Sequence, residues 1–194
     1  MKPLLLLLVV VAFLSPVSAQ KMKSAFTGYD LKGWVEPEGN IWWTADNGIL
    51  MAESDPSQQG SILWTKKKYK DFVVQLDFKM GKGTVDSGVF LRAESPQIQI
   101  GESGSLKRDM TCSPYVPGKG YPVEAAGVAT LLKTEGWNTM RIEMRGQTAT
   151  VWLNGEEVMT YTAETDIAKG PIGLQLHPKR DMSIEFRNIE VGKL

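Results

Sequence analysis

One stretch of this sequence constrains the fold more than any other, because apolar and polar residues alternate along it. From residue 72 to residue 80 every second side chain is large and apolar, and Val73, Gln75, Asp77 and Lys79 stand between them. Successive side chains of a β-strand point to opposite faces, so this order gives a strand with one buried face. A helix with the same order would scatter its apolar groups around its circumference. The segment therefore predicts a half-buried strand of an antiparallel sheet.

The same alternation returns later in the chain, with short turn sequences between the segments. It covers residues 139–145, 148–153, 171–177 and 182–187. Asn154-Gly155 predicts a two-residue hairpin, since both central positions of a type I′ turn need positive φ, and Asp46-Asn47-Gly48 predicts another. Residues 103–136 look irregular, and only residues 163–169 suggest a helical turn. Many short strands with almost no helix predict an all-β fold, a sandwich of two antiparallel sheets.

The first 19 residues have the features of a secretory signal peptide. Lys2 precedes the apolar run Leu4–Leu14, and Val17-Ser18-Ala19 offers a small-residue cleavage site. The run is too short to span a bilayer comfortably, and no second one follows. We therefore predict a signal peptide over residues 1–19, one β-sandwich domain over residues 20–194, export to the periplasm or the medium, and no membrane anchor.

Composition excludes several classes of function. The chain has 22 basic residues, one of them in the signal peptide, and 22 acidic residues, so charge gives no reason to expect nucleic acid as a partner. Cys112 is the only Cys, so no internal disulfide can form. One Cys and one His exclude an ordinary zinc site. No phosphate-binding loop or Gly-x-Ser-x-Gly elbow is present. No cofactor is evident, although loop oxygens could hold a divalent cation such as Ca²⁺.

Residues 86–102 place polar side chains where a core needs none. Asp86-Ser87-Gly88 is typical of a turn, and alternation puts Arg92 on one face of the strand that follows. On the next strand Gln97 and Gln99 point away from the apolar row. Glu102 comes directly after a glycine, which leaves its direction open. These residues are either part of a ligand site or the solvated outer face of a sheet.

His177, the only His, lies on the polar face of a third predicted strand. Gly173 and Gln175 share that face, and an aliphatic row occupies the other. An imidazole titrates near neutral pH and suits proton transfer. The alternative is a surface His at the end of a strand. A catalytic interpretation requires that His177 and Arg92 face one shared hollow.

The chain has six Trp, and an exposed indole suits carbohydrate binding because its flat face can stack on a sugar ring. Trp137 and Trp152 sit in or beside patterned strands, so we expect them to pack in the core. The pattern leaves Trp34 and Trp64 undecided, and Trp64 is our candidate for contact with substrate.

The motifs in order resemble those of the 3-keto-disaccharide hydrolase domain family, over essentially the whole mature chain. The matching pieces are residues 26–34, 43–50, 62–65, 69–79, 86–92, 97–102, 137–146, 151–155, 170–177 and 186–191. The resemblance implies a concanavalin-like jelly roll, an exported bacterial protein and a role in sugar breakdown. It also implies a polar site made of Arg92, Gln99, Glu102, Gln175 and His177. Where the family often has Glu-x-Gln-x-x-Asp, this chain begins the motif with Gln97, which cannot act as acid, base or anionic ligand.

What the resemblance implies chemically is the cleavage of glycosides that carry a ketone at C3. The ketone acidifies the C2 proton, so elimination of the C1 oxygen followed by hydration breaks the bond. We expect His177 and Glu102 as base and acid in either order, with Arg92 stabilising the oxyanion. Gln97, Gln99, Gln175 and Trp64 would bind substrate. The alternative is a carbohydrate-binding module without catalysis on the same fold.

Overall fold

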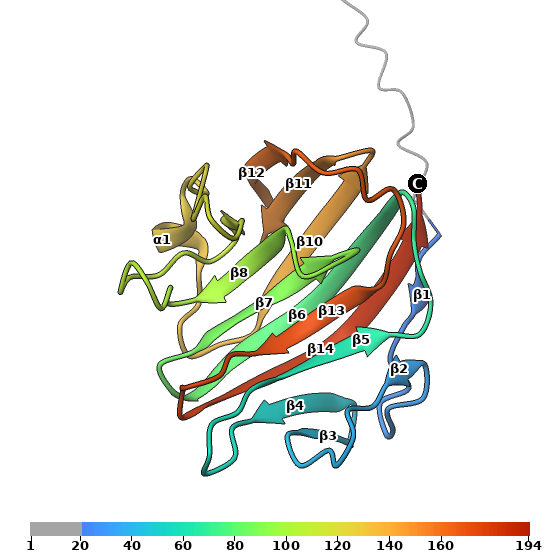
Figure 1. The fold of residues 1–194 in the computed structure, drawn as a ribbon, viewed down its shortest axis with the longest axis vertical. Helices are drawn as coiled ribbons and strands as arrows, with labels where there is room; N and C mark the ends of the chain where they lie inside the picture. The colour runs from blue at the N-terminus through green and yellow to red at the C-terminus, as the bar shows by residue number, and fades with distance from the viewer. Residues whose placement is uncertain (1–20) are drawn as a thin grey trace, which may run out of the picture.

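The computed structural model describes residues 21–194, which form two antiparallel sheets packed face to face (Figure 1). The predicted signal peptide lies outside the described residues. In Figure 1 the strands β5, β13, β7 and β8 lie in front of β14, β6, β10 and β11, so the two sheets form separate layers. The predicted fold class, an all-β sandwich of antiparallel sheets, is confirmed.

The large sheet has eight strands in the order β12-β11-β10-β6-β14-β4-β3, and β1 pairs with β14 beside this path. Its strands are β1 (Lys23–Ser24), β3 (Trp43–Asp46), β4 (Ile49–Glu53), β6 (Phe72–Gly83), β10 (Asn138–Arg145), β11 (Thr148–Leu153), β12 (Glu156–Thr162) and β14 (Met182–Lys193). The two predicted hairpins join β3 to β4 and β11 to β12. Asn154 and Gly155, between β11 and β12, both have the positive φ that the type I′ turn requires.

The small sheet has six strands in the order β2-β5-β13-β7-β8-β9. Its strands are β2 (Trp34–Val35), β5 (Ser61–Thr65), β7 (Asp86–Leu91), β8 (Gln97–Gly101), β9 (Pro114–Tyr115) and β13 (Ile172–Leu176). The central strands β7 and β13 are distant in sequence and are hydrogen-bonded neighbours. The sheet therefore brings polar residues from distant segments onto one face.

The core lies between the sheets and is made by the alternating rows. Leu76 of β6 pairs with Met140 of β10, and all the side chains expected to face inward between residues 72 and 78 are buried. On the small sheet the inward row of β13 is Ile172, Leu174 and Leu176. The other face of β13 therefore points away from the core.

Two local expectations are wrong. Residues 163–169 contain no helical turn; the one helix among residues 21–194 is α1 (Val128–Leu131), within the region expected to be irregular. Asp86-Ser87-Gly88 is not a turn, because β7 already begins at Asp86 and pairs with β8 along its length. Among residues 21–194 no helix has the length and apolar character needed to cross a bilayer.

Candidate active site

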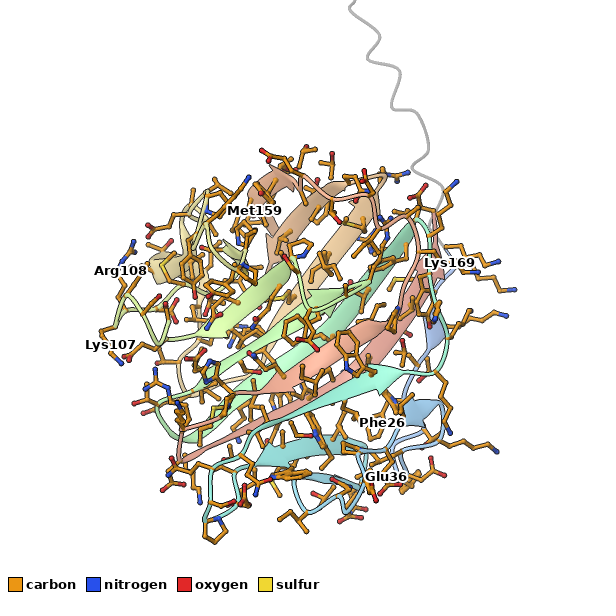
Figure 2. The ribbon with its side chains drawn as sticks, viewed as in Figure 1. Phe26, Glu36, Lys107, Arg108, Met159 and Lys169 are labelled. Carbon is orange, nitrogen blue, oxygen red and sulfur yellow. The ribbon has the colours of Figure 1, made fainter. Side chains whose placement is uncertain are left out.

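A pocket of about 430 Å³ opens on the outer face of the small sheet, where β13 ends and β7 begins. Strand residues form its floor, and the segments 103–107, 115–121 and 177–180 form its walls. Figure 2 shows Lys107, a wall residue, at the tip of the loop that follows β8. The lining residues are Asp86, Gln97, Gln99, Ser103, Gly104, Ser105, Lys107, Tyr115, Tyr121, Gln175, His177, Pro178, Lys179 and Arg180.

Cross-strand register brings the three glutamines together on the pocket floor. Gln97 Nε2 donates to Gln175 Oε1 at 2.7 Å and to the Ser87 carbonyl at 3.1 Å. A Cβ on Gly88, in the neighbouring strand, would collide with the side chain of Gln97. Gly88 therefore leaves the room in which the Gln97 amide reaches Gln175.

Asp86 is the anionic centre of the pocket, and its side chain is only 4 % exposed. Gln99 Nε2 donates to Asp86 Oδ1 at 2.8 Å, and Arg180 Nη2 lies 3.3 Å from Asp86 Oδ2. A buried carboxylate without such partners would be costly. The two donors therefore fix the orientation of the Asp86 carboxyl group at the first residue of β7.

His177 stands beside this carboxylate with its ring nitrogens in different environments. Nδ1 lies 2.7 Å from the Pro178 carbonyl, which can only accept, so Nδ1 carries a proton. In the neutral ring Nε2 is then the unprotonated nitrogen, and it lies 4.0 Å from Asp86 Oδ2. At that distance no hydrogen bond forms between them, so Nε2 is free to take a proton from a bound molecule.

Two tyrosines also line the pocket, and one of them, Tyr115, is the cross-strand partner of Gln97. The Tyr115 and Tyr121 rings lie 5.3 Å apart between centroids. Burial raises the pKa of Tyr121, and the charges of Asp86 and Tyr115 raise it further, while an interaction with Ser103 lowers it. Tyr121 therefore keeps its phenolic proton at neutral pH and can donate it.

Of the predicted site residues, the structure gathers His177, Gln97, Gln99 and Gln175 around one pocket. It does not bring Arg92 there, and the expected strand parity is wrong at this residue. β7 ends at Leu91, and Arg92 has a φ of 71°, so the chain leaves the sheet and the side chain turns to the far end of the strand. Its guanidinium bonds to Asp71 and to the carbonyls of Lys70, Gly146 and Ile167.

Glu102 and Trp64 also lie outside the lining. Gly101 has a φ of 88°, and after it Glu102 forms a bridge with Asp109, whose pKa the Glu102 charge helps to raise. Burial is the larger cause of that rise. Trp64 shares the outer face of the small sheet but lies along the sheet from the pocket, over Gly173.

Two other Trp expectations are wrong. Trp137 and Trp152 are only partly buried, and each has a guanidinium over its ring: Arg187 at 4.0 Å and Arg141 at 5.9 Å. Trp34, which the sequence left undecided, is 1 % exposed and belongs to the core. Alternation alone places Trp152 on the outer face with Thr148 and Thr150, opposite the buried Val151 and Leu153.

Sequence reasoning missed Asp86, Arg180, Tyr115 and Tyr121. Asp86 was hidden by its turn-like neighbours, although it shares the parity of Gly88, which was already placed on the polar face. Arg180 follows a strand in a short loop, where no periodicity applies. The tyrosines lie in the irregular region, and only its unusual length pointed to function.

The pocket offers little to a divalent cation. Among residues 21–194 no three His, Cys, Asp or Glu side chains gather as a metal site. Asp86 is the only carboxylate in the lining, and its oxygens face N–H donors of Gln99 and Arg180. Ca²⁺ takes about six to eight oxygen ligands, so it does not fit beside that guanidinium. The reaction proposed below therefore uses no metal ion.

Comparisons with known proteins agree with the sequence resemblance. The model of the family described as 3-keto-alpha-glucoside-1,2-lyase-like domain matches residues 21–192. No curated protein matches the chain. A solved structure of a candidate glycosyl hydrolase from Parabacteroides distasonis is 25% identical, covers 90% of this chain and 100% of its own, and has a TM-score of 0.67.

Two further solved structures are similar in fold. The β-glucanase of Bacillus licheniformis is 15% identical over 92% of this chain and 99% of its own, with a TM-score of 0.60. The carbohydrate-binding module CBM66 from Bacillus subtilis is 13% identical over 83% of this chain and 96% of its own, with a TM-score of 0.55. These similarities confirm the concanavalin-like jelly roll, a fold that serves both enzymes and binding modules.

Proposed function

From the premise that the chain belongs to the family of 3-keto-alpha-glucoside-1,2-lyase-like domains, we propose that it cleaves glycosides oxidised to a ketone at C3. The observation that carries the proposal is the Nε2 of His177, which has no hydrogen-bond partner among the described residues and lies in the pocket lining 4.0 Å from Asp86 Oδ2. The pocket lining includes a histidine, a guanidinium and two phenols, and elimination needs a base, a cation and an acid.

His177 is the base of the proposed first step. Its Nε2 takes the acidified C2 proton and the ring becomes an imidazolium, which the adjacent Asp86 carboxylate stabilises. The C2–H electrons form the enolate, whose negative charge lies on the C3 oxygen. Arg180, which spends one of its five N–H donors on Asp86, lies where it can stabilise that oxygen. Arg180 thus takes the role that the sequence had given to Arg92.

Tyr121 is the acid of the same step. The enolate electrons form the C1=C2 double bond and expel the C1 oxygen, which leaves with the Tyr121 proton as the free alcohol. Water then adds its oxygen to C1 and gives a proton to the Tyr121 phenolate, and the His177 imidazolium returns its proton to C2, which yields the free ketosugar and restores both side chains. Because its pKa is raised, Tyr121 is protonated when the oxygen departs. In this scheme Tyr121 and Asp86 replace Glu102, which does not line the pocket.

Direct hydrolysis by two carboxylates fits the pocket less well. That reaction needs an acid and a second carboxylate on opposite sides of the bond, about 5 to 9.5 Å apart. Among the described residues Asp86 is the only carboxylate that lines the pocket. A single carboxylate can assist a histidine base, but it cannot fill both roles.

The test is turnover of an α-linked 3-keto-disaccharide by the purified protein, with the unoxidised disaccharide as a control. We expect sugar release from the ketone alone, and exchange of the C2 proton in deuterated water measured by NMR. Release from the unoxidised sugar at a similar rate would contradict elimination. His177→Ala should lose both release and exchange.

A binding module without catalysis is the second candidate, favoured by the indole of Trp64 on the same face of the sheet. It predicts saturable glycan binding by calorimetry with no product from any glycoside, oxidised or not. Product release that depends on His177 excludes it.

We also propose that the protein is exported, as the N-terminal 19 residues predict. Mass spectrometry of the protein recovered from the periplasm or medium should show a chain that begins at Gln20. A cytoplasmic protein that retains Met1–Ala19 would contradict export.

A further inference from the structure

The indole of Trp64 forms a flat surface beside the pocket that the proposed reaction does not use. Trp64 pairs across the strands with Gly173, and a Cβ on that glycine would lie 2.6 Å from the indole ring. The indole therefore lies directly over the bare backbone of β13. On the other side of Gly173, Phe90 supports it, with ring centroids 5.5 Å apart.

This surface is apolar and open. Val35, next in the same cross-strand row, is 49% exposed, and Trp64 is partly exposed. Within residues 21–194 the Trp64 indole N–H donates to no protein group, whereas Trp42 donates to Asp55. We call the surface of Val35 and Trp64 at Gly173, which the buried Phe90 supports, the Trp64 platform.

The platform is continuous with the pocket through the glutamine pair. Gln175 lines the pocket and lies two residues along β13 from Gly173, a step of roughly 6.6 Å. That step is comparable with the width of one sugar ring. Gln97 is the cross-strand partner of Phe90, so the same amide pair borders both the pocket and the platform.

The glutamine pair presents hydrogen-bonding groups that suit a sugar hydroxyl. Gln97 Nε2 donates to Gln175 Oε1, and within the described residues Gln175 Nε2 and Gln97 Oε1 have no protein partner. One donor and one acceptor thus stand side by side. A hydroxyl both accepts and donates, so a single one can satisfy both groups.

We propose that the Trp64 platform binds the second sugar ring of a disaccharide, the leaving ring, while the oxidised ring occupies the pocket. This inference rests on the proposed function. The apolar face of the leaving ring stacks on the indole, and a hydroxyl near the glycosidic bond bonds to Gln97 and Gln175. The protein therefore prefers disaccharides to glycosides with a small aglycone.

The first test compares a 3-keto-disaccharide with the methyl 3-keto-glucoside. We expect Trp64→Ala to lower the ratio of kcat/KM for the disaccharide to kcat/KM for the methyl glycoside by roughly fivefold to tenfold. Trp64→Phe, which keeps a ring, should lower it less. Equal losses on both substrates would overturn the platform, because they indicate a purely structural role.

Gly173→Ala tests the same surface without removing the indole. The new Cβ would stand 2.6 Å from the ring and displace it. We expect the same loss of disaccharide preference as in Trp64→Ala. An unchanged preference in a folded Gly173→Ala protein, shown by an unaltered melting temperature, would contradict the stacking geometry.

A binding measurement separates failure of the platform from failure of the proposed reaction. The probes are the unoxidised disaccharide and its component monosaccharide, titrated calorimetrically into wild type and Trp64→Ala. Tighter disaccharide binding that Trp64→Ala abolishes supports the platform even if no ketosugar is cleaved. Disaccharide binding that the variant leaves unchanged overturns it, whatever the turnover.

Discussion

The two ends of the small sheet each hold an Arg–Asp pair, and the two pairs differ in what else they touch. Arg92 lies 3.2 Å from Asp71 at one end, and Arg180 lies 3.3 Å from Asp86 at the other. Figure 2 shows Lys169, close in sequence to an acceptor of Arg92, and Lys107, at the pocket, on opposite sides of the molecule.

At the first end the protein supplies partners for both terminal nitrogens of the guanidinium, and among the described residues only the buried Nε has none. The Arg92 side chain is 2% exposed, and three backbone carbonyls accept from it besides Asp71. Burial lowers the pKa of this guanidinium, and Asp71 counteracts the shift. Gly146 lies between β10 and β11 of the large sheet, so the bonds of Arg92 tie the two sheets together at this end.

At the second end the Arg180–Asp86 pair has few other protein partners and adjoins a pocket. Arg180 bonds to Asp86 alone among the described residues, and His177 faces the same carboxylate without a hydrogen bond. A pocket of about 430 Å³ adjoins them. The difference teaches that unused bonding capacity on a buried charge marks a ligand site where it faces an open pocket, as it does at Arg180 and does not at Arg92.

The largest effect should come from the open end. His177→Ala should lower kcat for the 3-keto-disaccharide about 10²- to 10⁴-fold, because it removes the base. The unfolding free energy should change little, since the ring is 37% exposed. Steady-state kinetics and urea unfolding measure the two effects. Wild-type kcat in this variant would remove the pocket from the chemistry.

Replacing each arginine in turn compares the two ends directly, and the expected effect on kcat is smaller than that of His177→Ala. Arg180→Met should lower kcat about 10²- to 10³-fold, because the enolate loses its cation. KM should change less, since the charge develops only in the transition state. If Arg180→Met instead lowers the melting temperature and leaves kcat intact, the two ends are both structural.

Arg92→Met should do the opposite. Removing the guanidinium takes the Arg92 donors from three carbonyls and the counter-ion from Asp71, which is 35% exposed and keeps its bond from the Gly146 N–H. The unfolding free energy should therefore fall by about 1 to 3 kcal/mol. Turnover per folded molecule should persist. Methionine keeps an unbranched side chain and the same backbone cost at positive φ. Urea unfolding beside kinetics measures both, and loss of kcat at unchanged stability would restore Arg92 to the site.

Strand parity made the fold and four of the pocket's lining residues predictable. Where a strand continues, as at Gln97, Gln99 and Gln175, the side chain lies on the face that alternation assigned. Parity failed where the strand ended, because the positive φ of Arg92 reverses the direction of its side chain. The sequence before it contains no turn signal at that residue, so the end of β7 could not be located.

The rest of the pocket depends on loops, whose geometry tertiary packing decides. Arg180 and Tyr121 reach Asp86 only because the loop after β13 and the segment 115–121 fold over the same end of the sheet. Nothing in their local sequence specifies that meeting. Composition did help: a single His on a polar strand face had few structural reasons to be there, and His177 does line the pocket.

The smallest expected effect is a change in the pKa of one tyrosine, which distinguishes the two ends of the sheet. Burial raises the pKa of Tyr69, which bonds to Gly170 near the Arg92 end, and of Tyr121 in the pocket, where Asp86 raises it further. Asp86→Asn should therefore lower the pKa of Tyr121 and leave that of Tyr69 unchanged. NMR titration of the tyrosine ring carbons from about pH 8 to pH 12 measures both.

The same titration has a consequence for stability with a definite sign. A folded-state pKa above the unfolded value of about 10 means that the folded protein holds more protons, so stability falls as pH rises through that range. Asp86→Asn should make the alkaline loss smaller, by less than about 1 kcal/mol, because Tyr121 then titrates closer to its unfolded value. Equal shifts at both tyrosines would mean that Asp86 acts through the whole fold, and the open end would lose its distinct electrostatics.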